Sequence, residues 1–324
     1  MTYTPGTGRI PLAATLAVGA SAGVLFALEP FAGKVLLPRL GGSPSVWNTC
    51  VMVFQILLLV GYGYSVLLVR ARDVRQAVRF HTALVAATIV AWPLAVRALW
   101  MDPRPGWPPV AWVAATTLAG IGPPFALLSA TSPLLQVWLA RTSSAPLNVH
   151  WLYAASNIAS AVGLIAYVAV LEPFIGVSRQ STVLWLGYAA AMILALVVAR
   201  QASEPSASPP PPVPEDTRET EEVHESAGGR SHVEWIVISF GASLCLYAVN
   251  TYIATDVASF PLLWCFPLGV FLLGFAAGFS GVGVNSHFAT GLAAGVAEAV
   301  VVESVVATRT AAIRAVSDRF ISTP

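Results

Sequence analysis

The chain has 324 residues, of which 56% are hydrophobic and only 10% are charged, and its mean hydropathy is +0.72. A soluble domain carries roughly 25% charged residues, so charges this sparse exclude a soluble enzyme. The net charge of +1 comes with no basic stripe interleaved with aromatic residues, which excludes a nucleic-acid-binding protein. We therefore expect an all-α integral membrane protein, with the lipid bilayer as its partner.

Eight segments are apolar enough to be membrane-spanning helices, each of which needs about 20 residues. In chain order they cover residues 10–28, 46–69, 80–96, 110–140, 151–171, 181–199, 235–255 and 260–279. The first apolar run passes straight through a cleavage-like Ala20-Ser21-Ala22, which favours a retained helix over a signal peptide. The fourth is too long for one straight crossing and contains Pro123, Pro124 and Pro133, so we expect a broken helix there.

Residues 201–232 interrupt this pattern with six prolines and nine of the 33 charged side chains. A segment so polar buries too little apolar area to fold, so we predict a disordered cytoplasmic linker. It separates a six-helix membrane region (1–200) from two further membrane helices (233–280), giving eight membrane helices arranged as six plus two. Residues 281–324 form a tail of atypical composition that would fit a truncated or frameshifted reading frame, with a ninth helix as the alternative.

Arginines set the expected orientation. The connection between the second and third helices holds Arg70, Arg72, Arg75 and Arg79, and loops rich in Lys and Arg remain in the cytoplasm. This places the N-terminus in the cytoplasm of a multi-pass protein of the inner (plasma) membrane.

Charged side chains at membrane depth are costly and mark functional sites by default. Glu29 precedes Pro30 at the expected end of the first helix, and Glu172 precedes Pro173 at the end of the fifth. Both acids face the outside in this topology, as does the turn between the last two helices. The candidate residues of this side are Glu29, Lys34, Arg39, Glu172, Arg179, Asn250 and Asp256.

Two interpretations of these residues stay open. The acids can form a site for a small cation or a polyamine. Alternatively, Glu29 pairs with Lys34 or Arg39, Glu172 pairs with Arg179, and both pairs fix helix ends at the interface. Each acid also lies in a repeated phrase, LEPFAG at residues 28–33 and LEPFIG at residues 171–176. Internal repeats are common in transporters, although six residues are too few to establish one.

Signatures of catalysis and metal binding are missing from the sequence. It has no Walker loop, GxSxG or HExxH, and no GxGxxG after a predicted strand, so we expect no catalytic residue and no cofactor. Cys50, Cys245 and Cys265 lie far apart in apolar stretches, which gives neither a disulfide framework nor a metal pair. The GxxxG spacings at 19–23 and 274–278 predict close helix packing.

Four ordered stretches resemble the bacterial membrane proteins described as fused MFS/spermidine synthases. They begin with ALEPFAGKVLLPRLGG in residues 27–68 and continue with LLSATSPLLQVWLA (127–140), LYAASNIASAVGLIAY (152–167) and NTYIATDVASFPLLWCFPLGVFLLGF (250–275). In that family, a multi-helix membrane region precedes a spermidine-synthase-like domain with a glycine-rich nucleotide loop and an acidic general base.

No glycine-rich loop of this kind occurs in the chain. The resemblance therefore implies a polyamine-linked membrane module without the catalytic aminopropyltransferase domain, hence not an enzyme, with a separately encoded synthase domain as a conceivable partner. Two alternatives remain, namely a permease or binding protein for a small cation or polyamine, and a truncated product without independent activity.

Overall fold

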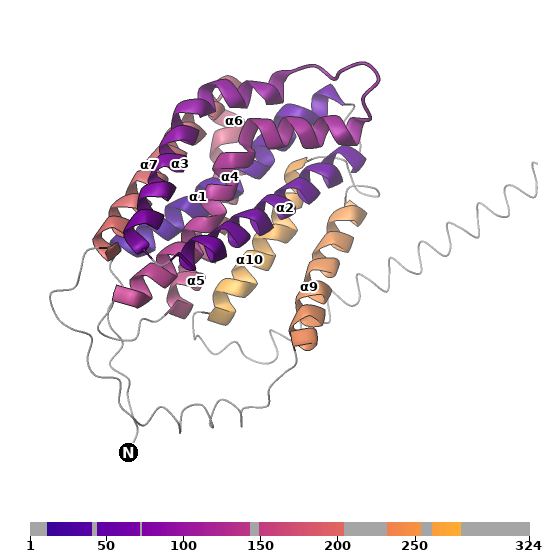
Figure 1. Ribbon diagram of the computed structural model, residues 1–324. Coiled ribbons are helices and arrows are strands. Elements are labelled where there is room, and N and C mark those ends of the chain that lie inside the picture. The colour runs from indigo at the N-terminus through magenta and orange to yellow at the C-terminus, as the bar shows by residue number, and fades with distance from the viewer. Residues whose placement is uncertain are drawn as a thin grey trace, which may run out of the picture. The chain divides into compact units, whose positions relative to one another are not determined.

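The computed structural model describes residues 12–40, 44–71, 73–142, 149–203, 232–253 and 261–279. In this part of the chain every regular element is helical (Figure 1), and eight α-helices have 15 residues or more. They are α1 (Leu12–Leu36), α2 (Pro44–Val69), α3 (Val74–Ala95), α4 (Pro109–Thr142), α5 (Val149–Ala166), α7 (Val177–Ser203), α9 (His232–Tyr252) and α10 (Cys265–Phe279). Each of the eight predicted segments lies on one of them, so the all-α prediction is confirmed.

Shorter helical turns join these helices. They are η1 (Leu37–Arg39), η2 (Val96–Trp100), the π-helical η3 (Tyr167–Leu171), the three-residue α6 (Glu172–Phe174) and η5 (Pro261–Trp264).

Six helices of the described chain are long and apolar enough to cross a membrane. The spans are Leu12–Arg39, Ser45–Val69, Val74–Trp100, Pro109–Ala140, Trp151–Phe174 and Val177–Gln201, and α10 adds a shorter apolar helix. Large apolar side chains such as Leu59, Val90 and Leu94 are more than two-thirds exposed on their surfaces, as expected where lipid replaces water. The protein is a polytopic membrane protein.

The described helices divide into two compact units. The first contains α1 to α7 together with η5 and α10, and the second contains α9. The predicted linker lies mostly outside the described residues, apart from its ends in α7 and α9, and so does the tail beyond Phe279.

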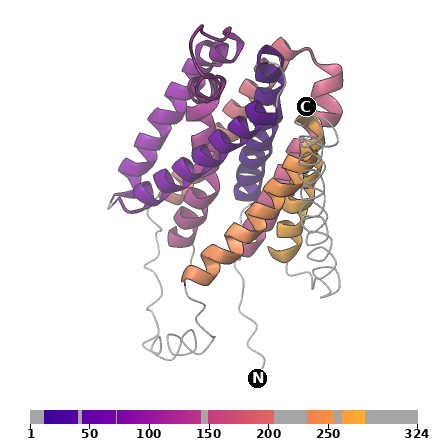
Figure 2. The same ribbon diagram turned by 90° about the vertical axis from the view of Figure 1, so that its right-hand side faces the viewer.

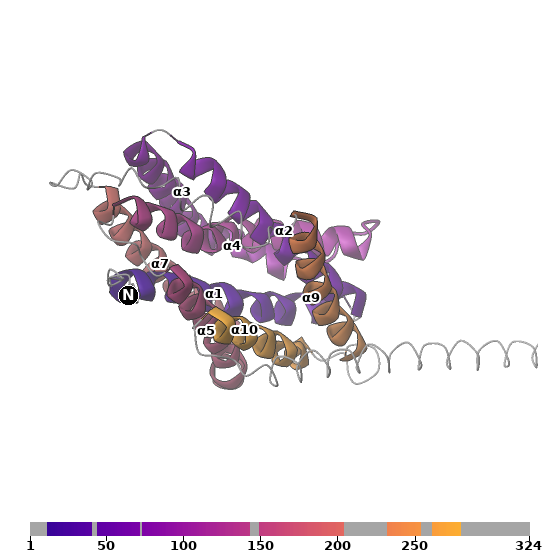
Figure 3. The ribbon, with the colours of Figure 1, turned by 90° about the horizontal axis from the view of Figure 1, so that it is seen from below.

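Helix α1 lies in the middle of the first unit. It packs against α5, α7 and α4, while α10 packs on α5 and α2 on α4. Figure 3 shows α1 between α4 on one side and α5 with α10 on the other. The α3–α4 and α5–α7 connections lie at the same end of this unit (Figure 2). Lys34, Glu172 and Gln180 lie at this end.

Local sequence explains where several helices begin. Pro44 and Pro109 are the first residues of α2 and α4, positions where proline's missing N–H costs nothing. Asp73 caps α3, because its carboxylate accepts hydrogen bonds from the backbone N–H groups of Arg75 (2.9 Å) and Gln76 (3.4 Å).

Prolines interrupt the helices less than we expected. The first helix does not close at Glu29-Pro30, because α1 runs through Pro30 to Leu36 and continues as η1. The expected break in the fourth segment is also wrong, since α4 is one helix through Pro123, Pro124 and Pro133. Each proline removes a single backbone donor, and the hydrogen bonds of the turns on either side keep these helices continuous.

The first GxxxG spacing forms the predicted packing seam, between α1 and α5. A Cβ atom built on Gly163 would lie 2.6 Å from the Cα atom of Gly23, and one on Gly23 would lie 3.2 Å from the carbonyl oxygen of Ala159. Only glycine allows backbones to approach so closely. The second spacing lies on α10, which packs on α5.

Candidate functional site

Glu29 lies inside a membrane-spanning segment. The span that contains it runs from Leu12 to Arg39, so about ten residues, or roughly 15 Å of helix, separate its carboxylate from the end of the span. The residue is only 8% exposed, and its neighbours Leu28, Phe31 and Ala32 are completely buried. Within the described part of the chain, its carboxylate makes no hydrogen bond and no ion pair. Glu29 is thus a buried acid without a counter-charge among those residues.

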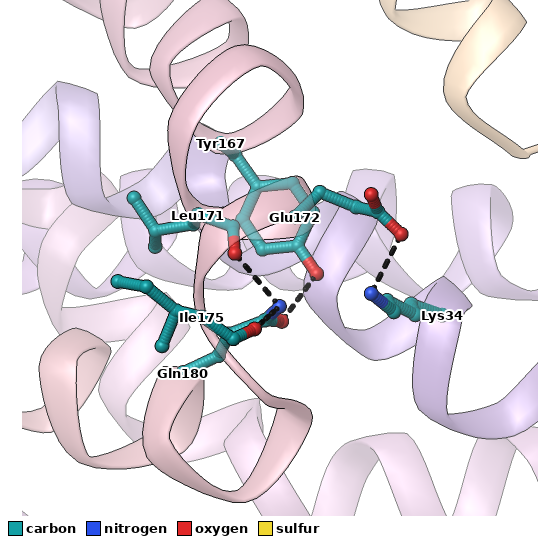
Figure 4. Close-up of polar contacts among 6 residues, drawn as sticks. All are labelled: Lys34, Tyr167, Leu171, Glu172, Ile175 and Gln180. Atoms are coloured by element: carbon teal, nitrogen blue, oxygen red, sulfur yellow. Dashed lines mark hydrogen bonds and ion pairs between the residues drawn. The ribbon is translucent and has the colours of Figure 1, made fainter.

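Lys34 and Glu172 form an ion pair between α1 and α6. The Lys34 Nζ atom donates to the Glu172 Oε1 atom at 2.6 Å (Figure 4), and both side chains are roughly one-quarter exposed. The partners we expected from sequence are therefore wrong. Lys34 follows Glu29 by five residues, which turns it about 140° around the helix and toward α6. Arg179 is exposed, and no ion pair of its side chain occurs among the described residues.

Gln180 supports the turn between α5 and α7. Its side chain is completely buried and makes three hydrogen bonds, all drawn in Figure 4. The Nε2 atom donates to the carbonyl oxygens of Ile175 (2.7 Å) and Leu171 (3.0 Å), and the Oε1 atom accepts from the Tyr167 hydroxyl (2.9 Å). One amide thus donates to two backbone carbonyls, of which that of Leu171 also accepts from the Ile175 N–H.

The need for Gln180 arises from the end of α5. Its last turn widens into the π-helix η3, where the Glu172 N–H donates to the Tyr167 carbonyl five residues earlier. Pro173 follows and has no N–H to donate, and the helix ends at Ile175 in an extended conformation. This local geometry turns Tyr167 toward Gln180 and Glu172 toward Lys34 (Figure 4).

Cys265 connects these groups to Glu29. Cys265, at the start of α10, lies within electrostatic range of the Glu29 carboxylate and of the Tyr167 hydroxyl. Tyr167 also interacts electrostatically with Glu172. We name the following residues the polar cluster: Glu29, Lys34, Tyr167, Glu172, Gln180 and Cys265.

A second ion pair lies outside the polar cluster. Arg39 pairs with Asp102 through its Nη1 atom at 3.2 Å and also donates to the carbonyl oxygen of Trp100. These contacts join the end of α1 to the α3–α4 connection. Asp102 was not among the sequence candidates because it lies in a polar loop rather than at membrane depth.

The remaining candidates fall elsewhere. Asn250 lies on α9, in the second unit, and Asp256 lies outside the described residues. Of the predicted set, the structure pairs Lys34 with Glu172, whereas no hydrogen bond or ion pair joins Glu29 to either of them. The structure adds Tyr167, Gln180 and Cys265, for which the sequence offers a weak signal, namely polar atoms within otherwise apolar stretches.

A metal site usually consists of several His, Cys, Asp or Glu side chains that converge on one ion. Among the residues that the structure describes, no group of three or more His, Cys, Asp or Glu side chains converges on one point. The polar cluster offers instead one paired acid, one unpaired acid and the base that neutralises the former.

Comparisons with protein-family models, curated proteins and solved structures give no match to this chain. The family resemblance therefore rests on the four sequence stretches quoted above.

Proposed function

We propose that the protein binds or transports a small cation in the membrane, with Glu29 as the acid that holds it. The observation that carries this proposal is the burial of the Glu29 carboxylate inside α1 without a partner among the described residues. A buried acid must be neutralised by a proton, a base or a bound cation. Intramembrane acids of this kind mark ion and proton pathways in other membrane proteins.

The experiment is uptake and binding of small cations by the purified protein in liposomes. The probes are protons, sodium, potassium, putrescine and spermidine. The variants are Glu29→Gln and the matched control Asp102→Asn. Asp102 is an exposed acid outside the polar cluster. We expect Glu29→Gln to abolish uptake or binding of the active cation, while Asp102→Asn retains it. Equal activity of both variants, or no activity toward any cation, would overturn the proposal.

The sequence resemblance supports a finer proposal. By that resemblance, the chain is the membrane module of a fused MFS/spermidine synthase, which makes polyamines the first organic cations to test and a separately encoded synthase domain the first protein partner to seek. A truncated product without independent activity is the outcome in which none of the probes binds.

We also propose that this chain is not an enzyme. Aminopropyl transfer needs a nucleotide cradle and a base within hydrogen-bond reach of the attacking amine, and the sequence contains no glycine-rich loop that would form the cradle. The purified protein should therefore transfer no aminopropyl group from decarboxylated S-adenosylmethionine to putrescine. Product detected by mass spectrometry above a protein-free control would contradict this.

The proposed location is the inner membrane, with the N-terminus in the cytoplasm. The arginine-rich connection between α2 and α3 supports this orientation. It places the polar cluster nearer the external face.

A further inference from the structure

The buried acid of α1 also indicates which cation it holds, an inference that rests on the proposed function. We infer that Glu29 binds a proton reversibly and that its charge controls the contact between α1 and the segment formed by η5 and the start of α10. Two observations carry this inference, and they are independent of each other. One is the charge balance of the polar cluster, and the other is the packing around the carboxylate.

The charge balance leaves room for one positive charge. Lys34 and Glu172 neutralise each other at 2.6 Å, so Glu29 adds a single unmatched negative charge to the described residues of the cluster. A polyamine carries two or more positive charges and would leave at least one of them unmatched in a site of low polarity, which is costly. One monovalent cation, or one proton, balances the cluster.

The packing favours the proton over a larger cation. Leu28, Phe31 and Ala32 are completely buried, and Glu29 itself is 92% buried. A metal ion needs several oxygen ligands around it, whereas the Glu29 carboxylate has no hydrogen bond or ion pair with any described residue, and the residues next to it on α1 are apolar. A proton needs neither space nor further ligands.

The groups that face Glu29 are few. Cys265 on α10 is the titratable group with which it interacts electrostatically. The other elements packed against α1 carry Cys50 on α2, Arg97 on η2, Tyr167 on η3 and Arg179 on α7 at this end. Glu172, which follows η3, is already paired with Lys34. Among the described residues of this region, Glu29 is therefore the carboxyl group whose charge is not balanced by a base.

Loss of the proton has a structural consequence. A neutral carboxylic acid is compatible with the buried position of Glu29 on α1, but a carboxylate in the same place must be solvated. Water must then enter beside Cys265, or η5 and the start of α10 must move away from α1. A two-state contact whose balance depends on one proton is the element that proton-coupled transport requires.

Infrared difference spectroscopy of the full-length protein in lipid nanodiscs tests proton binding directly. As the pH falls from about 9 to about 5, a carbonyl band of a protonated carboxyl group should appear in the parent protein. The band should be absent from Glu29→Gln and retained in Asp102→Asn. If the parent protein shows no such band, or if Glu29→Gln retains the band, the inference is overturned.

Cysteine labelling tests the structural consequence. In a Cys50→Ala, Cys245→Ala background, a water-soluble thiol reagent should label Cys265 faster as the pH rises. The thiol's own ionisation also accelerates labelling, so the same background with Glu29→Gln supplies the baseline. We expect Cys265 to be labelled several-fold faster than this baseline at high pH when Glu29 is present. Identical pH profiles of the labelling rate would overturn the proposed control of the contact between α1 and the η5–α10 segment.

The two proposals fail in different ways. If sodium or potassium alters the Glu29 carboxylate bands at constant pH, and no proton-dependent band exists, the protein binds a cation but this inference is wrong. If the proton-dependent band exists and neither protons nor other cations cross the liposome membrane, the proton site stands and the proposed transport is wrong.

Discussion

Gln180 supplies hydrogen bonds to backbone carbonyl groups at a helix end that contains proline. It lies in the first turn of α7 and donates to two carbonyl groups at the end of α5. Leu171 has a second donor in the Ile175 N–H, so the Ile175 carbonyl and the Tyr167 hydroxyl depend on Gln180 more strongly. These two groups decide the cost of removing the amide.

Gln180→Leu should destabilise the protein strongly. The change keeps the volume of the side chain but leaves the Ile175 carbonyl and the Tyr167 hydroxyl without their partner, at a cost of about 2 kcal/mol or more. Reversible unfolding in mixed micelles would measure it. The matched variant Tyr167→Phe removes only the hydroxyl and should cost about 1 kcal/mol. A larger loss from Tyr167→Phe than from Gln180→Leu would contradict this account.

The ion pair between Lys34 and Glu172 should contribute modestly to stability. Both side chains are roughly one-quarter exposed, so solvent screens their attraction. A double-mutant cycle with Lys34→Met and Glu172→Gln should give a coupling free energy of about 0.5–1 kcal/mol, which falls as salt is added. No coupling at low salt would mean that the pair does not hold α6 against α1.

The two copies of the LEPF sequence differ in the secondary structure that they form. In the first copy, Glu29 and Pro30 lie inside α1 and are buried, and the helix continues to Leu36. In the second, Glu172 and Pro173 follow a π-turn that ends α5, and Phe174 is 80% exposed. The same four residues thus continue one helix and end another, because α1 is enclosed by other helices and the end of α5 is not.

The seam between α1 and α5 should tolerate no side chain at Gly163. A Cβ atom there would lie 2.6 Å from the Cα atom of Gly23, so Gly163→Ala must push the helices apart and should cost about 1–3 kcal/mol. Gly63→Ala is the control, because a Cβ atom at Gly63 meets nothing within 4 Å. It should be neutral or stabilising by up to about 1 kcal/mol. The two variants should differ clearly in the same unfolding assay.

At the scale of the whole molecule, the six spans and the arginine bias together predict which loops face the cytoplasm. Gln76, at the start of α3, and Pro105, in the α3–α4 connection, are both exposed and uncharged. Replacing either one leaves the distribution of arginines unchanged.

Single cysteines at these positions should report opposite sides of the membrane. In a background without native cysteines, Pro105→Cys should react with a membrane-impermeant reagent added outside, and Gln76→Cys should react only after the membrane is opened. The reverse pattern would invert the topology, and labelling of both from outside would show that α3 does not cross the membrane.

The sequence by itself determined the membrane class, the helical fold and the approximate place of all eight helices. These features follow from local physics, because a run of about 20 apolar residues must satisfy its backbone within the segment once it enters lipid. The close packing at Gly19 and Gly23 could also be predicted from the sequence, since this spacing places both glycines on one face of a helix.

Only the tertiary structure decided the partners of the charged residues. The sequence placed Glu29 at a helix end beside Lys34, whereas the folded chain buries Glu29 within α1 and gives Lys34 to Glu172, 138 residues away. Whether a helix continues through proline, and which side chain an ammonium group reaches, depends on the helices that surround it. These surrounding helices are distant in sequence. The members of the polar cluster could therefore be identified only from the packed arrangement of α1, α5, α7 and α10.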